Sequence, residues 1–112
     1  MMRKGKVLYN NRFAGELIEN DDGEYVFEYA VDYIQDYPDQ FITFSMPVRR
    51  EKYLSNRLFP FFEGLIPEGW LLDIATKNWK LNPNDRMGLV LACCANCIGA
   101  VSVESINEEE DA

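Results

Sequence analysis

The chain has 112 residues, of which 47% are hydrophobic and 13% aromatic, and its net charge is −8 at pH 7. This length and composition predict one globular domain with its own core and exclude an intrinsically disordered chain. The acidic balance argues against direct nucleic-acid binding, which needs a basic surface to neutralise phosphates. We expect a soluble cytoplasmic protein, because no apolar run approaches the roughly 20 residues of a membrane span and no signal peptide is recognisable.

The first half of the chain has the patterns of β-strands. The sequence NN at 10–11 is a hairpin turn signal between two β-prone runs, and NDDG at 20–23 is a second turn signal. In EYVFEYA, at 24–30, every second residue is aromatic, which predicts a half-buried strand. The next segment, DYIQDYPD, predicts a turn or short helix interrupted by Pro38. Strands are therefore expected at 6–9, 13–18, 24–30 and, in FITFSM, at 41–45.

The second half changes to a helical pattern. RLFPFFEGLI reads as a short helix in which Pro60 is tolerable only in the first turn. A second helix is expected from about 68 to 80, and the sequence NPND then ends it and caps a third helix from 86 to about 94. The segment AVSVES predicts a last strand at 100–104.

These elements predict an α+β fold, in which a small antiparallel sheet or open barrel packs against two to three helices between residues 57 and 95. We expect one domain over residues 1–105. Residues 106–112 form an acidic end that is expected to be disordered.

Three cysteines, Cys93, Cys94 and Cys97, lie close together near the end of an apolar run. The spacing of Cys94 and Cys97 fits a redox pair or half of a zinc site, but the chain has no histidine and no second cysteine pair. We therefore expect small buried thiols that behave as hydrophobic residues, and no metal site.

Trp70 opens the helix that follows the corner Pro67-Glu68-Gly69. On a helical wheel Trp79 lies on the apolar stripe with the leucines, whereas Trp70 lies on the opposite side. Trp70 can pack locally against a loop, or it can point outward as a binding anchor, a role that tryptophan often fills. The second interpretation gives a candidate partner-binding set of Glu68, Trp70, Asp73 and Lys77.

Patterns of catalytic residues are missing from the sequence. The chain has no histidine, no glycine-rich phosphate loop and no pair of carboxylates at a recognisable spacing. We therefore predict no catalytic residues and no cofactor, and expect a binding module more than a catalyst.

The order of motifs resembles the N-terminal domain of the HipA family of serine/threonine kinase toxins. The resemblance runs from about residue 6 to 104 and rests on five ordered elements. These are Val7, Asn10, Ala14, Gly15 and Leu17 at the start, the aromatic strand FEYAVDYI, the segment Ser45 to Val48, the corner FFEGLIPEG, and NCIGAV at 96–101. The chain departs from the family pattern at Cys94, where a glycine is common, at Asn96, where an aspartate is usual, and at Trp70, where a polar residue is usual.

The resemblance implies a function through a partner. HipA-family toxins carry their ATP site and catalytic residues in domains C-terminal to this one, and this sequence ends before them. It thus resembles the free-standing HipS-like subunit of HipBST toxin–antitoxin systems. That likeness implies an antitoxin that neutralises a HipT-like kinase toxin, with a HipB-like DNA-binding protein in the same complex. The alternative is a non-inhibitory N-terminal structural domain or fragment of a longer HipA-like kinase, and a thiol redox enzyme is a distant third.

Overall fold

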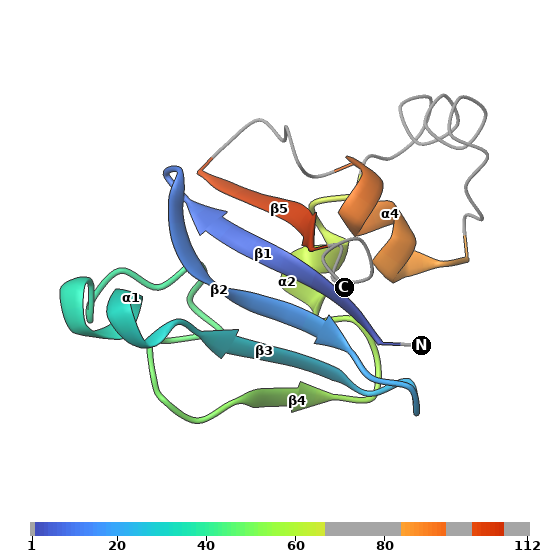
Figure 1. Ribbon diagram of the computed structural model, residues 1–112, viewed down its shortest axis with the longest axis horizontal. Helices are drawn as coiled ribbons and strands as arrows, with labels where there is room; N and C mark the ends of the chain where they lie inside the picture. Colours follow the sequence, from blue (N-terminus) through green and yellow to red (C-terminus); the bar gives the residue numbers. More distant parts are fainter. Residues whose placement is uncertain (1, 67–83, 94–99, 107–112) are drawn as a thin grey trace.

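The computed structural model describes residues 2–66, 84–93 and 100–106. Within them, five strands and three helices are arranged as an antiparallel sheet with helices at one face and at one end (Figure 1). The elements are β1 (Arg3–Tyr9), β2 (Arg12–Glu19), β3 (Tyr25–Tyr29), α1 (Val31–Asp36), β4 (Tyr53–Ser55), α2 (Pro60–Glu63), α4 (Arg86–Cys93) and β5 (Val101–Ile106). None of the described helices is long and apolar enough to cross a membrane.

The sheet has the strand order β4-β3-β2-β1-β5, and every pairing is antiparallel. The last strand, β5, therefore lies beside the first, β1 (Figure 1). This arrangement confirms the predicted α+β fold with an open antiparallel sheet. Proline occupies the first turn of α2, as its sequence position predicted.

The β1–β2 hairpin turns at Asn10 and Asn11, whose φ angles are 52° and 66°. A two-residue turn of this hand matches the right-handed twist of the flanking strands, and asparagine tolerates positive φ better than most residues. The predicted hairpin is confirmed, with Tyr9 opposite Arg12.

The strand predicted at 41–45 is wrong. These residues form bends and turns, and the strand that pairs with β3 at that edge of the sheet is instead β4, at Tyr53–Ser55. The backbone N–H of Ile42 donates to the hydroxyl of Tyr29, and the N–H of Met46 donates to the carbonyl of Thr43. Side-chain and turn hydrogen bonds have therefore replaced a strand ladder in this segment.

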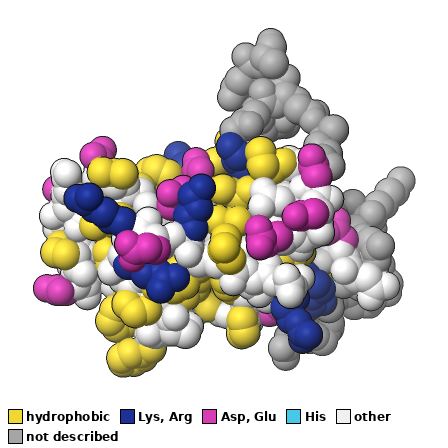
Figure 2. Space-filling view, turned by 90° about the horizontal axis from the view of Figure 1, so that it is seen from below, with side chains coloured by type: hydrophobic (Ala, Val, Ile, Leu, Met, Phe, Trp, Pro, Cys, Tyr) yellow, Lys and Arg dark blue, Asp and Glu magenta, His cyan; other side chains and the backbone are white. Residues whose placement is uncertain are grey.

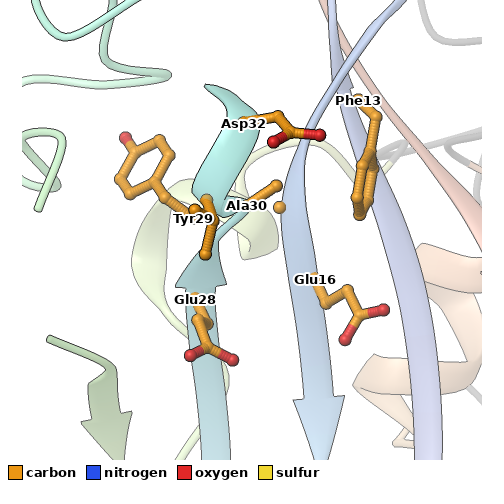
Figure 3. A pocket seen from close by; sticks show the side chains of 8 residues that line it. Phe13, Glu16, Glu28, Tyr29, Ala30 and Asp32 are labelled. Carbon is orange, nitrogen blue, oxygen red and sulfur yellow. The ribbon is translucent and has the colours of Figure 1, made fainter. Parts of the chain in front are cut away.

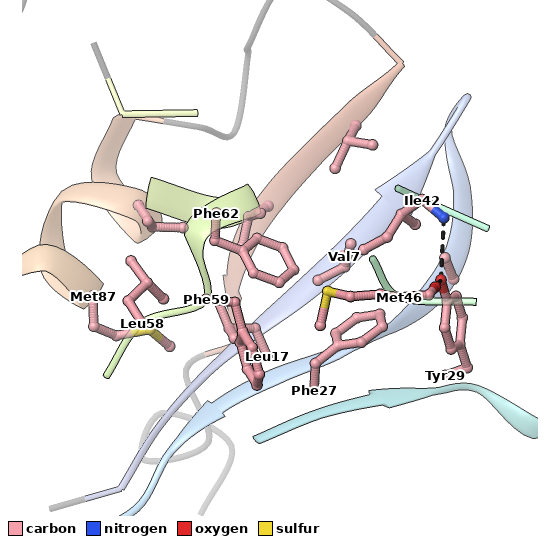
Figure 4. Close-up of a cluster of buried hydrophobic side chains, with 14 of the residues drawn as sticks. Val7, Leu17, Phe27, Tyr29, Ile42, Met46, Leu58, Phe59, Phe62 and Met87 are labelled. Carbon is pink, nitrogen blue, oxygen red and sulfur yellow. Dashed lines mark hydrogen bonds between the residues drawn. The ribbon is translucent and has the colours of Figure 1, made fainter. Parts of the chain in front are cut away.

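One face of the sheet carries the core (Figure 4). Phe27 is at its centre and contacts the Phe62 ring of α2, with the two ring centroids 5.7 Å apart. The buried residues of α4, Met87, Leu89 and Val90, pack on the same side. Since α2 and α4 both supply this core, the opposite face of the sheet is the outer face.

Arg3 links the beginning of α4 to the sheet through hydrogen bonds and ion pairs. Its guanidinium donates two hydrogen bonds to the carboxylate of Asp85, at 2.8 and 2.9 Å, and a third to Glu19 on β2, at 2.7 Å. Asp85 also accepts the backbone N–H of Gly88 in the first turn of α4, so it caps the helix as its sequence predicted.

Candidate partner-binding surfaces

The partner-binding residues predicted from the sequence, Glu68, Trp70, Asp73 and Lys77, lie outside the described residues, as do Trp79, Cys94, Cys97 and the acidic end from residue 107. Their roles stay predictions. Among the residues that the structure describes, no group of three or more histidine, cysteine or acidic side chains is placed to hold a metal.

A loop at residues 40–47, here called the aromatic loop, is held by tyrosine hydroxyls. The Tyr29 hydroxyl accepts the N–H of Ile42 and donates to the carbonyl of Met46 (Figure 4). Tyr33 donates to the carbonyl of Gln40 at 2.6 Å, and Tyr53 donates to the carbonyl of Pro47. Both ends of the loop are thus fixed to β3, α1 and β4.

These tyrosines are protonated donors at neutral pH. Burial raises the pKa of Tyr29 to about 12, and burial also raises the pKa of Tyr33 and of Tyr53. Removing the phenol from water disfavours the charged phenolate, so the hydrogen bonds to the loop carbonyls persist over the physiological pH range.

The aromatic loop presents Phe44 to solvent. The side chain of Phe44 is 88% exposed, and its ring lies 5.1 Å from the ring of Phe41, measured between centroids. Figure 2, which looks onto the molecule from the β4 side, shows hydrophobic side chains reaching the surface between charged ones. Leu54 on β4 is a further exposed apolar residue, at 61%.

Sequence reasoning missed Phe44 because the β-prone residues of FITFSM predicted a strand there. The available signals were the prolines at 38 and 47, which bracket the segment, and the tyrosines at 29, 33 and 53. Neither signal states which side chain the loop turns outward, since that depends on contacts between residues distant in sequence.

A second surface is a pocket of about 370 Å³ between β2, the end of β3 and the start of α1 (Figure 3). It is lined by eight residues, namely Phe13, Gly15, Glu16, Glu28, Tyr29, Ala30, Val31 and Asp32. The Tyr29 ring turns away from Phe13 and Glu16, toward the core side (Figure 3).

A β-bulge in β2 builds this pocket. Val7 pairs with Gly15 and Leu8 with Phe13, so Ala14 is an extra residue on β2. Residues 13 and 16 would alternate to opposite faces of a regular strand, and the bulge places both on the outer face. The carbonyl of Ala14 accepts the N–H of Ala30 at 2.8 Å, which ties the bulge to the start of α1.

Gly15 allows the two strands to approach beside the pocket. Gly15 pairs with Tyr29, and a Cβ at Gly15 would overlap the carbonyl oxygen of Glu28. Any larger residue would therefore separate β2 from β3 at this point. The sequence flagged Gly15 within a motif, but the bulge next to it has no local signature.

The comparisons with known proteins agree on one family. The sequence model of the HipA N-terminal domain matches residues 5–104. An uncharacterized protein of Haemophilus influenzae is 33% identical over 104 residues, which are 93% of each chain. The solved structure of the N-terminal domain of HipA toxin is similar with a TM-score of 0.69 and 26% identity, over 95% of this chain and 94% of that one. The protein described here therefore belongs to the HipA N-terminal domain family.

Proposed function

We propose that the protein is an antitoxin that binds and neutralises a HipT-like serine/threonine kinase toxin in a three-part toxin–antitoxin system. A HipB-like DNA-binding protein belongs to the same cytoplasmic complex. Membership of the HipA N-terminal domain family supports the toxin–antitoxin context. The likeness is to the N-terminal domain of HipA toxin, which supports a role without catalysis.

The observation that carries the binding role is the fixed display of Phe44. A large apolar side chain that is 88% exposed gains free energy when a partner covers it. Three tyrosine hydroxyls already hold the loop by four hydrogen bonds: they donate to the carbonyls of Gln40, Met46 and Pro47, and one of them accepts the N–H of Ile42. Little loop entropy would then be lost on association, so the apolar contact contributes more of its free energy to affinity.

The structural likeness to the N-terminal domain of HipA toxin favours a second candidate, in which the domain supports a kinase without inhibiting it. The two candidates differ in one outcome. An antitoxin suppresses the toxicity of the kinase, whereas a supporting domain binds the kinase and leaves the toxicity in place.

The test is co-expression with a HipT-like kinase from the same organism, scored by growth and by co-purification. We expect the wild-type chain to restore growth and to co-purify with the kinase. Co-purification without growth would establish the supporting role. If the kinase neither co-purifies with the chain nor loses its toxicity, the proposal is overturned.

Phe44→Ala tests whether the aromatic loop forms the interface. Truncating a central aromatic anchor typically costs about 2 kcal/mol, or roughly 30-fold in Kd. The matched control is Met2→Ala, which also truncates an exposed apolar side chain, and it is expected to bind like the wild type. Equal affinities for the two variants would remove Phe44 from the interface.

A further inference from the structure

We propose that the pocket between β2, β3 and α1 is a docking site for an arginine side chain of the partner kinase. The identity of the partner rests on the proposed function. The chemistry of the occupant rests on the pocket itself, in which apolar walls from Phe13 and Val31 stand beside the carboxylates of Glu16, Glu28 and Asp32.

The strand register brings like charges together on the outer face. Glu16 on β2 lies directly opposite Glu28 on β3, and such partners have Cβ atoms about 5 Å apart. Lys6 on β1 faces Glu16 from the other side. Lys6 is also paired with Glu104 on β5, so the row supplies one cation for three carboxylates. Asp32 at the start of α1 is the third carboxylate of the pocket, with Glu16 and Glu28.

Within the described part of the chain, none of these three carboxylates has an ion-pair or hydrogen-bond partner. Arg12, the nearest arginine in the sequence, already stacks on Tyr37, with its guanidinium carbon 4.7 Å from the ring centroid. A cation from another molecule would relieve the repulsion between Glu16 and Glu28, so charge complementarity specifies a basic occupant.

The walls favour arginine over lysine. Phe13 is 43% exposed, and its ring already attracts the ammonium of Lys6, which lies 5.9 Å from the ring centroid. A guanidinium is flat and weakly hydrated, so it can stack on an aromatic ring and still donate paired hydrogen bonds to a carboxylate. Val31, at 66% exposed, offers an apolar surface for the methylene stem of the same side chain.

The first test needs no kinase. N-acetyl-arginine-amide is titrated into the ¹⁵N-labelled protein, and the amide resonances of Gly15, Ala30 and Val31 are followed. The neutral isostere N-acetyl-citrulline-amide is the ligand control. We expect saturable shifts with the arginine probe, weaker ones with N-acetyl-lysine-amide, and none with citrulline. Equal shifts from arginine and citrulline, or no shift from arginine, would overturn the proposal.

The variant Glu16→Gln/Glu28→Gln removes the two facing charges and should abolish the arginine-induced shifts. Its control is Glu51→Gln/Asp22→Asn, which makes the same change in net charge at two exposed positions outside the pocket and outside the row of Glu28, Glu16 and Lys6. Thermal melts check that both variants fold. If the control loses the shifts as fully as the pocket variant, the attraction is only the general field of an acidic protein and the pocket is not the site.

The second test measures the Kd of the same variants for the purified kinase. We expect Glu16→Gln/Glu28→Gln to weaken binding at least tenfold and the control to change it less than twofold. If the wild type binds the kinase and the pocket variant binds it equally well, the arginine site is overturned and the proposed function is not affected. A wild-type chain that binds no kinase overturns the proposed function, and the titration with arginine still decides the pocket.

Discussion

The backbone N–H of Ile42 donates a 3.1 Å hydrogen bond to the hydroxyl of Tyr29, and the same hydroxyl donates to the carbonyl of Met46. One phenol therefore joins two points of the aromatic loop on either side of Phe44. Because Tyr29 is only 2% exposed and packs against Phe27, with ring centroids 4.8 Å apart, the loop takes its position from the core.

Tyr29→Phe should destabilise the protein by about 1–3 kcal/mol. The change removes one hydroxyl and leaves a buried donor and a buried acceptor without their partner, while the ring volume is preserved. Chemical denaturation measures the loss, and amide exchange at Ile42 should accelerate more than exchange in β1.

The control for this change is Tyr9→Phe, which removes a tyrosine hydroxyl for which the described residues show no hydrogen bond. Its free energy of unfolding should stay within about 0.5 kcal/mol of the wild type. Equal stabilities of the two variants would show that the Tyr29 hydroxyl does not hold the loop.

Stability should fall at alkaline pH. Burial raises the pKa of Tyr29 to about 12, above its ordinary value near 10, so the folded state holds this proton more tightly than the unfolded state. The resulting stabilisation is complete below pH 10 and is lost as pH rises through the folded-state pKa. With about 1.4 kcal/mol for each pKa unit, the loss is on the order of 3 kcal/mol. Denaturation curves between pH 9 and 12 should be steeper for the wild type than for Tyr29→Phe, and parallel curves would contradict this assignment.

The sequence predicted the elements with strong local signals. The Asn10–Asn11 turn fixed the first hairpin, the alternation in 24–30 marked β3, and the Asp85 cap marked the start of α4. The strand expected at 41–45 was wrong because FITFSM has β-prone residues but its backbone hydrogen bonds go to Tyr29 and to a turn. The actual edge strand, β4, has only three residues, too few for periodicity to show.

Asp85→Asn should loosen the contact between α4 and the sheet. The change keeps a capping oxygen for Gly88 but removes the charge that pairs with Arg3. Because both side chains are about one third exposed or more, we expect a loss of only about 1 kcal/mol. The control is Asp36→Asn, an exposed position at the end of α1, which should leave the stability unchanged.

The same variant tests a pH dependence at the acidic end. The Arg3 guanidinium lowers the pKa of the Asp85 carboxyl, so its stabilisation is present above the ordinary carboxyl pKa, about 4, and is lost as pH falls through the folded-state pKa. The difference in stability between wild type and Asp85→Asn should therefore shrink as pH falls below 4. A difference that stays constant down to pH 2 would show that the loss does not come from the charge of Asp85.

The candidate surfaces were only partly within reach of the sequence. The sequence contains the acidic and aromatic residues of the pocket, but it does not show that they lie together. Phe13 and Glu16 share a face only because Ala14 is bulged. Strand register and bulges arise from pairing between distant segments, so a reading of local patterns does not find them. Phe44 was missed for the same reason, since the hydroxyls that position it come from three other elements.

Replacing Cys93, Cys94 and Cys97 together by alanine should leave kinase binding intact. We expect at most a packing loss of about one or two kcal/mol, because free thiols in an apolar run act as small hydrophobic residues. Metal analysis of the purified wild type accompanies the binding measurement. Stoichiometric zinc, or loss of binding in a variant that still folds, would mean that the thiols have a functional role.

Trp70 and Trp79 should behave in opposite ways. The helical-wheel position of Trp70, opposite the apolar stripe, predicts a side chain that is exposed in the free protein and buried against the kinase, flanked by Glu68 and Asp73. Trp70→Ala should weaken kinase binding by about 2 kcal/mol or roughly 30-fold, with little change in Tm. Trp79→Ala removes a residue of the apolar stripe and should destabilise the domain by about 3–5 kcal/mol.

Growth rescue at matched expression, tryptophan fluorescence and thermal melts separate the two tryptophans. Fluorescence of the Trp79→Phe variant reports Trp70 alone, and its emission should shift to the blue when the kinase is added, since the indole leaves water. If the Trp70→Ala substitution unfolds the protein, Trp70 packs locally. Trp70→Ala that still protects cells fully would show that Trp70 is no anchor, and the interface would then have to rest on other residues, with Phe44 the first to test.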